Sequence, residues 1–276
     1  MATNKSVFFR NDDVRDRLDS SLIDLTMLCI EHQVPIQHAV EPANVTSEVA
    51  EWLIGIKKQH PDLIEIIQHG YSHNLKNPQQ KMEFGGKRGY QDQYDDIKKG
   101  KEIMDHTFGH LWEPIFTFPY GTFNEHTLMA INNLGYKAIS SKIKFTFKGQ
   151  IKNRLGKLLG KDMLVGKHIS YHPGLHNGYQ FREISVSANL IRSYTGETTA
   201  EHYALEDILK QITTAGIHTD IIGVLFHHRF HANVLNLTAQ LINTLRDKGY
   251  SFSTLSNLLK QNQNQDTKVN RKFPWQ

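Results

Sequence analysis

The chain has 276 residues, of which 39% are hydrophobic and 22% are charged. This composition is that of a globular protein that can bury a core, and the length is typical of a single α/β barrel. The formal net charge is only +4, and lysines cluster no further than short pairs such as Lys57-Lys58, so nothing supports nucleic-acid binding. The single cysteine, Cys29, excludes an internal disulfide.

The amino-terminal residues, Met1 to Ser6, contain no apolar segment of a secretory signal. No stretch of the sequence approaches the roughly 18 apolar residues of a membrane span. From these features we expect a cytoplasmic protein with no membrane span. No repeat, linker or composition break divides the chain, so we expect one domain over residues 1–276, with its core at about 5–260 and a polar tail at 261–276.

The first half of the chain alternates short apolar runs with helical patterns. Apolar runs predict strands, and apolar residues spaced three and four apart predict helices. The predicted strands are residues 7–10, 34–40, 63–67, 114–118 and 137–140. The predicted helices between them are residues 18–28, 46–56, 91–108 and 124–134, the first with Asp19 or Ser20 as its N-cap.

The second half begins with an irregular stretch, residues 141–195, in which we expect only an edge strand around 168–171. Helices are then predicted at 200–215, 234–248 and 255–260, and strands at 221–226 and 251–254. Alternation of strand and helix, repeated about seven times, predicts a parallel sheet covered by helices, either open or closed as a barrel.

Two histidines, His69 and His73, follow the apolar run 63–67. A spacing of four places both imidazoles on the same side of a helical turn, where they can converge on one point. Imidazole nitrogen binds zinc and similar divalent ions at about 2.0–2.1 Å. The pair alone also has an ordinary explanation, because the chain has 16 histidines and such a spacing arises by coincidence on a solvated surface.

Other polar residues also follow predicted strands. Asp12-Asp13 end the first strand, Pro119-Tyr120-Gly121 follows the fourth, and His227-His228 follow the strand at 221–226. Each has an alternative explanation by itself: a charge pair on a helix dipole, a simple turn, or a surface pair beyond a core strand. Because the carboxyl ends of parallel barrel strands share one face, which carries the active site, the joint pattern predicts a functional cluster.

These residue types suit metal-dependent hydrolysis. Two imidazoles and one carboxylate make a three-ligand metal site that leaves positions for water and substrate. Adjacent carboxylates at a strand end alternate in direction, so one of Asp12 and Asp13 can bind the metal while the other acts as a base on water. A histidine across the mouth can protonate the leaving group, and N–H groups of the 119–121 turn can hold an oxyanion.

The motifs resemble those of the polysaccharide deacetylases of carbohydrate esterase family 4, the NodB-like fold. Asn11-Asp12-Asp13 is similar to the Asp-Asp of their first motif, and residues 69–73 are similar to their His-Ser/Thr-x-x-His, with glycine at the second place. Residues 117–121 match Arg-x-Pro-Tyr-Gly in part, and residues 225–227 match Leu-x-His. The motifs occur in the order of the family over about residues 7–260, and the resemblance implies a distorted (β/α)7 barrel.

The resemblance also implies roles for the polar residues. Asp12 would be the general base, and Asp13, His69 and His73 would hold the metal. Zinc is the usual metal of the family, with cobalt, nickel and manganese as alternatives.

His227 would be the general acid, with its neighbour His228 as a competitor. The Tyr120 N–H would help to bind the oxyanion. The substrate-binding residues would be Leu225, which lines the acetyl pocket, and Pro119 and Gly121.

The sequence departs from the family at two places. Thr117 stands where the third motif has the arginine that orients the base, and residues 141–215 contain no match to the fourth motif, Asp-x-x-Asp-Trp. Arg10, beside the two aspartates, is a candidate replacement for that arginine, although strand alternation alone leaves its direction open.

The implied reaction is hydrolysis of an N-acetyl group, less often an O-acetyl group, on a sugar or oligosaccharide. A cytoplasmic location would favour a sugar intermediate of surface-polysaccharide assembly as the substrate. Two alternatives are a metal-dependent amidase that acts on a non-sugar C–N bond and a non-catalytic carbohydrate-binding protein on the same fold. The sequence contains no indication of the oligomeric state.

Overall fold

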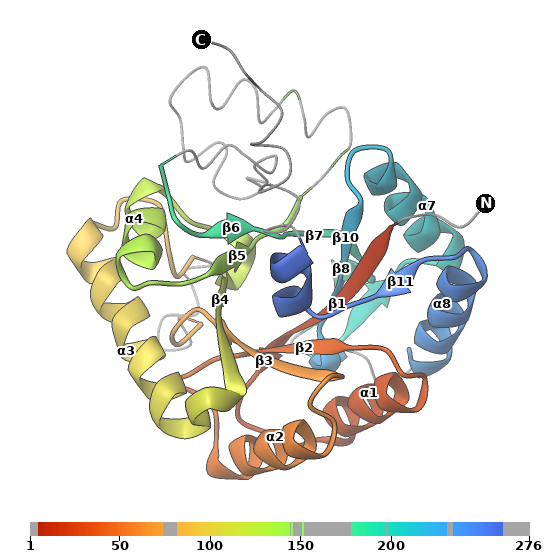
Figure 1. Ribbon diagram of the computed structural model, residues 1–276, viewed down its shortest axis with the longest axis horizontal. Coiled ribbons are helices and arrows are strands. Elements are labelled where there is room, and N and C mark those ends of the chain that lie inside the picture. Colours follow the sequence, from red (N-terminus) through yellow and green to blue (C-terminus); the bar gives the residue numbers. More distant parts are fainter. Residues whose placement is uncertain are drawn as a thin grey trace.

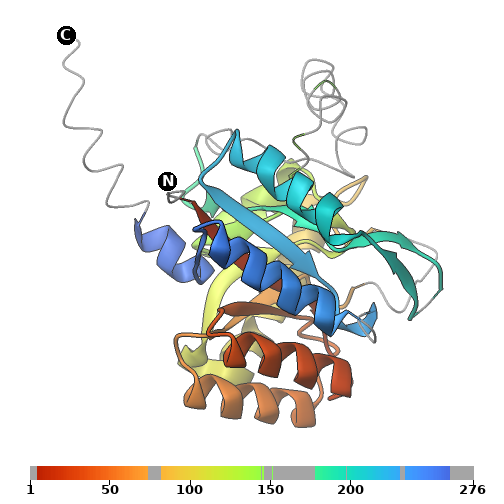
Figure 2. The same cartoon turned by 90° about the vertical axis from the view of Figure 1, so that its right-hand side faces the viewer.

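The computed structural model describes residues 5–73, 82–143, 145, 151, 178–196, 198–230 and 234–261. Its centre is a curled parallel sheet with helices packed around the outside (Figures 1 and 2). The edge strand expected at 168–171 and the tail beyond residue 261 lie outside the described residues. Within the described ranges, no helix combines the length and the apolar character that crossing a bilayer requires.

The strands follow one another around the sheet in a simple order. From β1, the chain adds β2, β3, β4 and β5 in turn on one side, and β10 and β7 lie on the other side of β1. β6 pairs with β5, and β11 pairs with the start of β1. The bounds of these strands are β1 (Ser6–Val14), β2 (Ile36–Val40), β3 (Ile64–His69), β4 (Trp112–Thr117), β5 (Ala138–Ser140), β6 (Arg182–Glu183), β7 (Val186–Asn189), β10 (Ile221–Phe226) and β11 (Ser251–Phe252).

The two ends of this strand order are joined by hydrogen bonds. The N–H of Val186 in β7 donates to the Ser141 carbonyl just after β5 at 3.0 Å, and the Val186 carbonyl accepts from Ile143 N at 2.7 Å. β6 and β7 therefore share one position between β5 and β10. The result is a barrel with seven strand positions, irregular where β6 passes into β7. The distorted (β/α)7 barrel that the resemblance implies is confirmed.

The helices cover the outer face of the sheet, as Figure 1 shows. Their apolar faces pack against the outward side chains of the strands in two large clusters. Asp19 accepts from Leu22 N at 2.9 Å and caps the first helix, as one of the two predicted N-caps. The bounds of the helices are α1 (Ser20–Glu31), α2 (Ser47–Gln59), α3 (Tyr90–Phe108), α4 (Glu125–Asn133), α7 (Leu205–Gly216) and α8 (Leu235–Asp247).

The helix predicted at 200–215 begins only at Leu205. Residues Ala200–His202 instead form β9, which pairs antiparallel with β8 (Ile191–Tyr194). The pairing is continued by hydrogen bonds from Tyr203 N to Leu190 O at 2.8 Å and from Thr195 N to Thr199 O at 3.0 Å. The prediction was wrong there because cross-strand pairing outweighs the weak helix propensity of a few residues.

Apolar side chains fill the barrel interior at the end where the parallel strands begin. Alternate strand residues such as Phe8, Ile67 and Leu225 point inward and form an apolar cluster with side chains of the closing helical segment, residues 255–261. Glu65, buried at the start of β3, accepts the N–H groups of Leu255 and Ser256 at 2.9 and 3.0 Å and so holds this segment in place. The carboxyl ends of the strands remain for the polar residues.

Candidate active site

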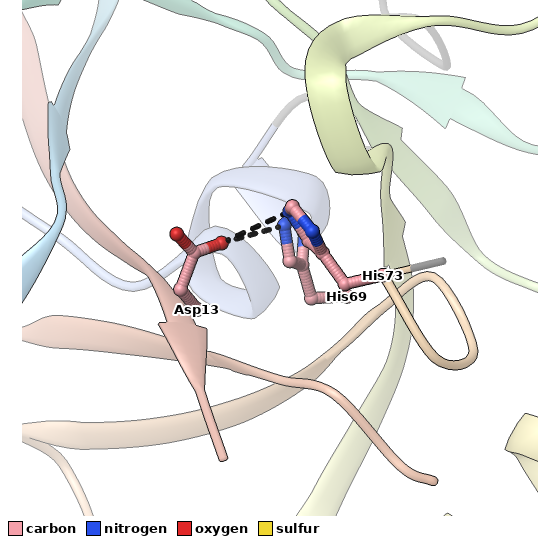
Figure 3. Close-up of side chains that lie close together, drawn as sticks. All are labelled: Asp13, His69 and His73. Carbon is pink, nitrogen blue, oxygen red and sulfur yellow. Dashed lines mark ion pairs between the residues drawn. The ribbon is translucent and has the colours of Figure 1, made fainter. Parts of the chain in front are cut away.

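Asp13, His69 and His73 converge at the carboxyl ends of β1 and β3 (Figure 3). Oδ1 of Asp13 lies 3.3 Å from Nε2 of His69 and 3.3 Å from Nε2 of His73. All three donor atoms lie within 4.8 Å of one another, and the carboxylate points at both imidazoles in Figure 3. Two imidazole nitrogens and one carboxylate oxygen are a suitable donor set for zinc or a similar divalent ion.

The two histidines meet through a tight turn rather than a helix. His69 is the last residue of β3, and the chain then passes through Gly70 and His73 with φ angles of 58° and 51°. The helical turn predicted from their spacing was therefore wrong, although the predicted convergence is present. Asp13 also has a positive φ, 63°, near the end of β1, where the pairing with β2 is irregular. Left-handed conformations of non-glycine residues are strained and cluster at functional sites.

Glu83 supports the turn between the histidines. Its buried carboxylate accepts the N–H of Ser72 at 2.6 Å and that of Tyr71 at 3.3 Å. A Cβ at position 70 would lie 2.2 Å from Oε2 of Glu83 and 2.3 Å from Cγ of Pro119. Space and the positive φ therefore explain why glycine suits position 70.

Negative charge surrounds the histidines. Burial opposes ionisation of Asp13, yet the two imidazoles hold the pKa of its carboxyl well below the ordinary value. Burial would likewise lower the pKa of His73, but Asp13 outweighs it and raises that pKa to about 9. Glu41, buried just beyond β2 and 3.2 Å from Arg15, adds to the field, and burial together with Asp13 raises the pKa of its own carboxyl. The site is built to hold positive charge.

A divalent ion fits this site better than a proton does. Although it lies near two imidazoles, Oδ1 of Asp13 is a buried oxygen that receives no hydrogen bond of good geometry from the described residues. Leaving a buried acceptor unsatisfied costs about 1–3 kcal/mol. An ion between Asp13, His69 and His73 would satisfy this oxygen and would take the place of the proton on His73.

Asp12 is held by Arg10, two residues before it on β1. Nε and Nη2 of Arg10 donate to the two carboxylate oxygens of Asp12, each at 2.8 Å, and both side chains are buried. Nη1 of Arg10 donates to the carbonyl of Ser140 at 2.6 Å and lies 2.9 Å from its Oγ, at the end of β5. Alternate strand residues point the same way, so Arg10 and Asp12 share the inner face of β1. The paired bonds fix the orientation of the carboxylate.

The adjacent histidines after β10 have different environments. His228 is buried, and its N–H donates to Oδ1 of Asn11 at 2.9 Å, with its Nδ1 3.2 Å from the same oxygen. His227 lies within electrostatic range of Asp13 and Asp12, and burial lowers its pKa. The structure therefore ties His228 to the strand framework, and the acid role of His227 stays a prediction.

The turn after β4 borders the cluster of Asp13, His69 and His73. Tyr120 has a φ of 59°, its hydroxyl donates to the His73 carbonyl at 2.9 Å, and the two ring centres are 4.4 Å apart. Asp13, His73 and Tyr120 are three of the four non-glycine residues with positive φ in the described part of the chain. Leu225 lies in the inner core two residues before His227. The oxyanion role of the Tyr120 N–H and the substrate contacts of Leu225, Pro119 and Gly121 stay predictions.

Neither Glu41 nor Glu83 was predicted from the sequence as part of this site. Glu41 directly follows β2, so its strand-end position was a usable signal. Glu83 reaches the histidine turn from a glycine-bearing loop, where no periodicity or spacing marks a single carboxylate.

Residues 42–139 match the family model described as polysaccharide deacetylase. Over this range the chain is similar to the polysaccharide deacetylases. The matched range includes the histidine turn and the 119–121 turn, while Asp12, Asp13 and His227 lie outside it. No curated protein sequence matches the chain significantly.

Several solved structures described as polysaccharide deacetylases or family 4 esterases share the fold. A proposed polysaccharide deacetylase from Mycobacterium smegmatis has a TM-score of 0.64 at 14% identity, with 96% of this chain and 92% of that chain covered. A family 4 acetyl xylan esterase from Clostridium thermocellum, in complex with a cobalt ion, has a TM-score of 0.58 at 12% identity, with 93% and 91% covered. A family 4 pseudoenzyme from Bacillus anthracis has a TM-score of 0.53 at 13% identity, with 94% and 66% covered. At these identities the likeness establishes the fold.

Thr117 contacts His69, a candidate metal ligand, rather than the candidate base. Oγ1 of Thr117 donates to the Gln68 carbonyl at 3.1 Å, which uses its only proton. At 2.6 Å from Nδ1 of His69 it therefore accepts, so that Nδ1 carries the proton and Nε2 is free to bind a metal. Asp12, the candidate base, is paired instead with Arg10 of β1, which the sequence offered as a candidate replacement for the arginine missing at position 117.

Replacing Thr117 with valine is expected to weaken zinc binding by about 10–100-fold, the usual effect of losing a partner that orients a ligand. Valine has nearly the same shape but cannot accept from Nδ1 of His69. The affinity is measured by competition with a chromophoric chelator. Thr117→Ser, which keeps the hydroxyl, should stay close to the wild-type affinity, and an unchanged affinity in Thr117→Val would contradict the tautomer assignment.

Proposed function

We propose that this protein is a metal-dependent deacetylase that hydrolyses an N-linked or O-linked acetyl group on a sugar. The observation that carries the proposal is the arrangement of two carboxylates with separate partners. Asp13 faces two imidazoles at 3.3 Å, while the adjacent Asp12 is held by Arg10 at 2.8 Å. One carboxylate is thus available to bind a metal and the other to act as an oriented base.

The metal would be held by Oδ1 of Asp13 and by Nε2 of His69 and His73. Zinc suits this donor set, and cobalt, nickel and manganese are alternatives. When bound, a divalent ion polarises the acetyl carbonyl and lowers the pKa of water at the site. The cobalt ion in the Clostridium thermocellum acetyl xylan esterase supports metal dependence by analogy.

The residues of the chain then supply the proton transfers. Asp12, oriented by Arg10, removes a proton from water as its oxygen bonds to the acetyl carbon. The Tyr120 N–H donates to the carbonyl oxygen while that oxygen gains negative charge. His227 delivers a proton to the sugar nitrogen or oxygen as its bond to the acetyl carbon breaks. The products are acetate and the free amino or hydroxyl sugar.

A non-catalytic sugar-binding protein is the second candidate. The Bacillus anthracis pseudoenzyme demonstrates that the fold also occurs without activity. Two features of the sequence favour a non-catalytic protein. The first, the missing arginine at position 117, is a weaker argument here because Arg10 pairs with Asp12 through two hydrogen bonds. The second feature, the absence of a match to the fourth family motif, still favours the non-catalytic protein.

Acetate release from a substrate panel tests the proposal. The panel contains N-acetylglucosamine oligomers, O-acetylated xylo-oligosaccharides, nucleotide-linked N-acetyl sugars as intermediates of surface-polysaccharide assembly, and a cyclic imide. We expect acetate from at least one acetylated sugar, loss of release after chelation, and recovery when zinc is added back. Opening of the imide alone would favour the amidase, and sugar binding without acetate release would favour the non-catalytic protein.

A further inference from the structure

Two exposed tyrosines stand beside the candidate active site. Six large apolar side chains are exposed in the described part of the chain, and only Tyr120 and Tyr194 among them are aromatic, at 36% and 56% exposure. Tyr120 lies against His73, and the ring centre of Tyr194 is 6.1 Å from that of His227. Single exposed apolar residues are normal on a protein surface, but both aromatic ones flank the same group of catalytic candidates.

The strand order places the two tyrosines on different sides of the barrel mouth. Tyr120 follows β4, while His227 beneath Tyr194 follows β10, and β3, β2 and β1 lie between these strands. Tyr194 itself ends β8, the first strand of the β8–β9 hairpin, which extends beyond the parallel sheet (Figure 2). The hairpin therefore carries an aromatic ring from outside the barrel to its mouth.

Tyr194 is held in this place by a second ring. Its ring centre is 5.0 Å from that of Phe230, with the planes at 71°, an edge-to-face contact. Desolvation, Asp13 and Asp12 raise the pKa of the Tyr194 hydroxyl above its ordinary value, so the hydroxyl lies within the field of both carboxylates and stays neutral at physiological pH. A fixed, neutral and exposed ring near the catalytic groups is suited to contact a ligand rather than to fill the core.

We propose that Tyr194 is a specificity-determining residue that binds a sugar ring of the substrate next to the acetyl group undergoing hydrolysis. A pyranose ring presents C–H groups on its faces, and these pack favourably on the negatively charged face of an aromatic ring. The hydroxyl of tyrosine remains available to the sugar hydroxyls at the rim. This inference rests on the proposed function because it takes a sugar as the ligand. It does not require that the protein hydrolyse that sugar.

The test compares binding with chemistry in Tyr194→Ala and Tyr194→Phe. The probes are the N-acetylglucosamine tetramer and an O-acetylated xylotetraose, whose binding is measured by calorimetry on the metal-loaded protein. Acetate release from each is measured in parallel, together with release from glyceryl triacetate, which has acetyl groups and no ring. We expect Tyr194→Ala to weaken binding of one tetramer by about tenfold and to raise KM accordingly, as for loss of an aromatic contact of about 1.4 kcal/mol. Tyr194→Phe should retain most of the affinity.

Release from glyceryl triacetate separates this role from a structural one. If Tyr194 merely positioned His227, Tyr194→Ala would lower turnover of glyceryl triacetate as well, and the proposal would be wrong. Tyr90→Ala, the same change at the start of α3, where the tyrosine hydroxyl accepts from Asn133 of α4, is the control and should leave binding of both tetramers unchanged.

The outcomes also distinguish this inference from the proposed function. Binding that depends on Tyr194 without acetate release would support the sugar contact and contradict the deacetylase. Acetate release with equal tetramer affinity in wild type and Tyr194→Ala would contradict the sugar contact and support the deacetylase. Failure of the wild-type protein to bind either tetramer would overturn the contact.

Discussion

Asp13→Ala is expected to abolish stoichiometric zinc binding and, with it, all acetate release. Asp13 is the one anionic donor of the three, and its Oδ1 faces both imidazoles at 3.3 Å. Loss of this side chain should therefore weaken the affinity for zinc by more than roughly 10–100-fold, the effect of losing a residue that only hydrogen-bonds a metal ligand. Zinc content after dialysis and competition titration measure the effect directly. His73→Ala should give the same result through loss of an imidazole donor.

The matched control is Asp12→Asn, at the neighbouring position. Asparagine keeps the shape of the aspartate that Arg10 holds, but it cannot act as the base. The variant should therefore bind zinc with the wild-type affinity and release no acetate. Full acetate release in Asp12→Asn would show that another group takes the proton. Loss of zinc in Asp12→Asn, with zinc retained in Asp13→Ala, would reverse the assignments of the two carboxylates.

Arg10→Met is expected to cost about 3–5 kcal/mol in the free energy of unfolding, because it leaves the buried carboxylate of Asp12 without its partner. Arg10 and Asp12 are each only 3% exposed and joined by two bonds of 2.8 Å, so water does not replace the lost donors easily. Urea unfolding measures the change. Turnover should fall as well, since the base is no longer oriented.

A double variant distinguishes the destabilisation caused by an unpaired charge from that caused by lost packing. Arg10→Met combined with Asp12→Leu removes both charges, and buried pairs replaced by apolar side chains often regain the stability lost in the single variant. The double variant should therefore be more stable than Arg10→Met alone. Equal stabilities of the two would mean that Asp12 does not depend on Arg10. Arg10→Lys, which keeps the charge without the two-pronged geometry, should lie between wild type and Arg10→Met.

Much of the framework followed from local pattern. The apolar run at 221–226 predicted β10 with its observed bounds, and the Asp19 cap and the helix at 91–108 also lie close to their predicted positions. These elements are long or strongly periodic, so short-range signals decide them. The same signals failed at residues 200–202, where a long-range strand pairing competes with helix formation.

The turn from His69 to His73 illustrates a partial success. Its spacing predicted that the imidazoles meet, and they do so near Asp13. The backbone that brings them together is a left-handed turn, which depends on space next to Glu83 and Pro119 that no local pattern reveals.

By itself, the sequence determined a parallel sheet covered by helices and placed Asp12, Asp13, His69 and His73 near strand ends, because periodicity is a local property. The resemblance to a known family added the barrel. Only the tertiary structure decided which groups are partners. The curled sheet brings Arg10 of β1 within reach of Ser140 at the end of β5, and this fixes Arg10 on the side of its neighbour Asp12. Tyr194 reaches the mouth through a hairpin outside the barrel. The contacts of Arg10 with Ser140 and of Tyr194 with His227 join residues far apart in the chain, so the curling of the sheet and close packing, which no local signal encodes, create them.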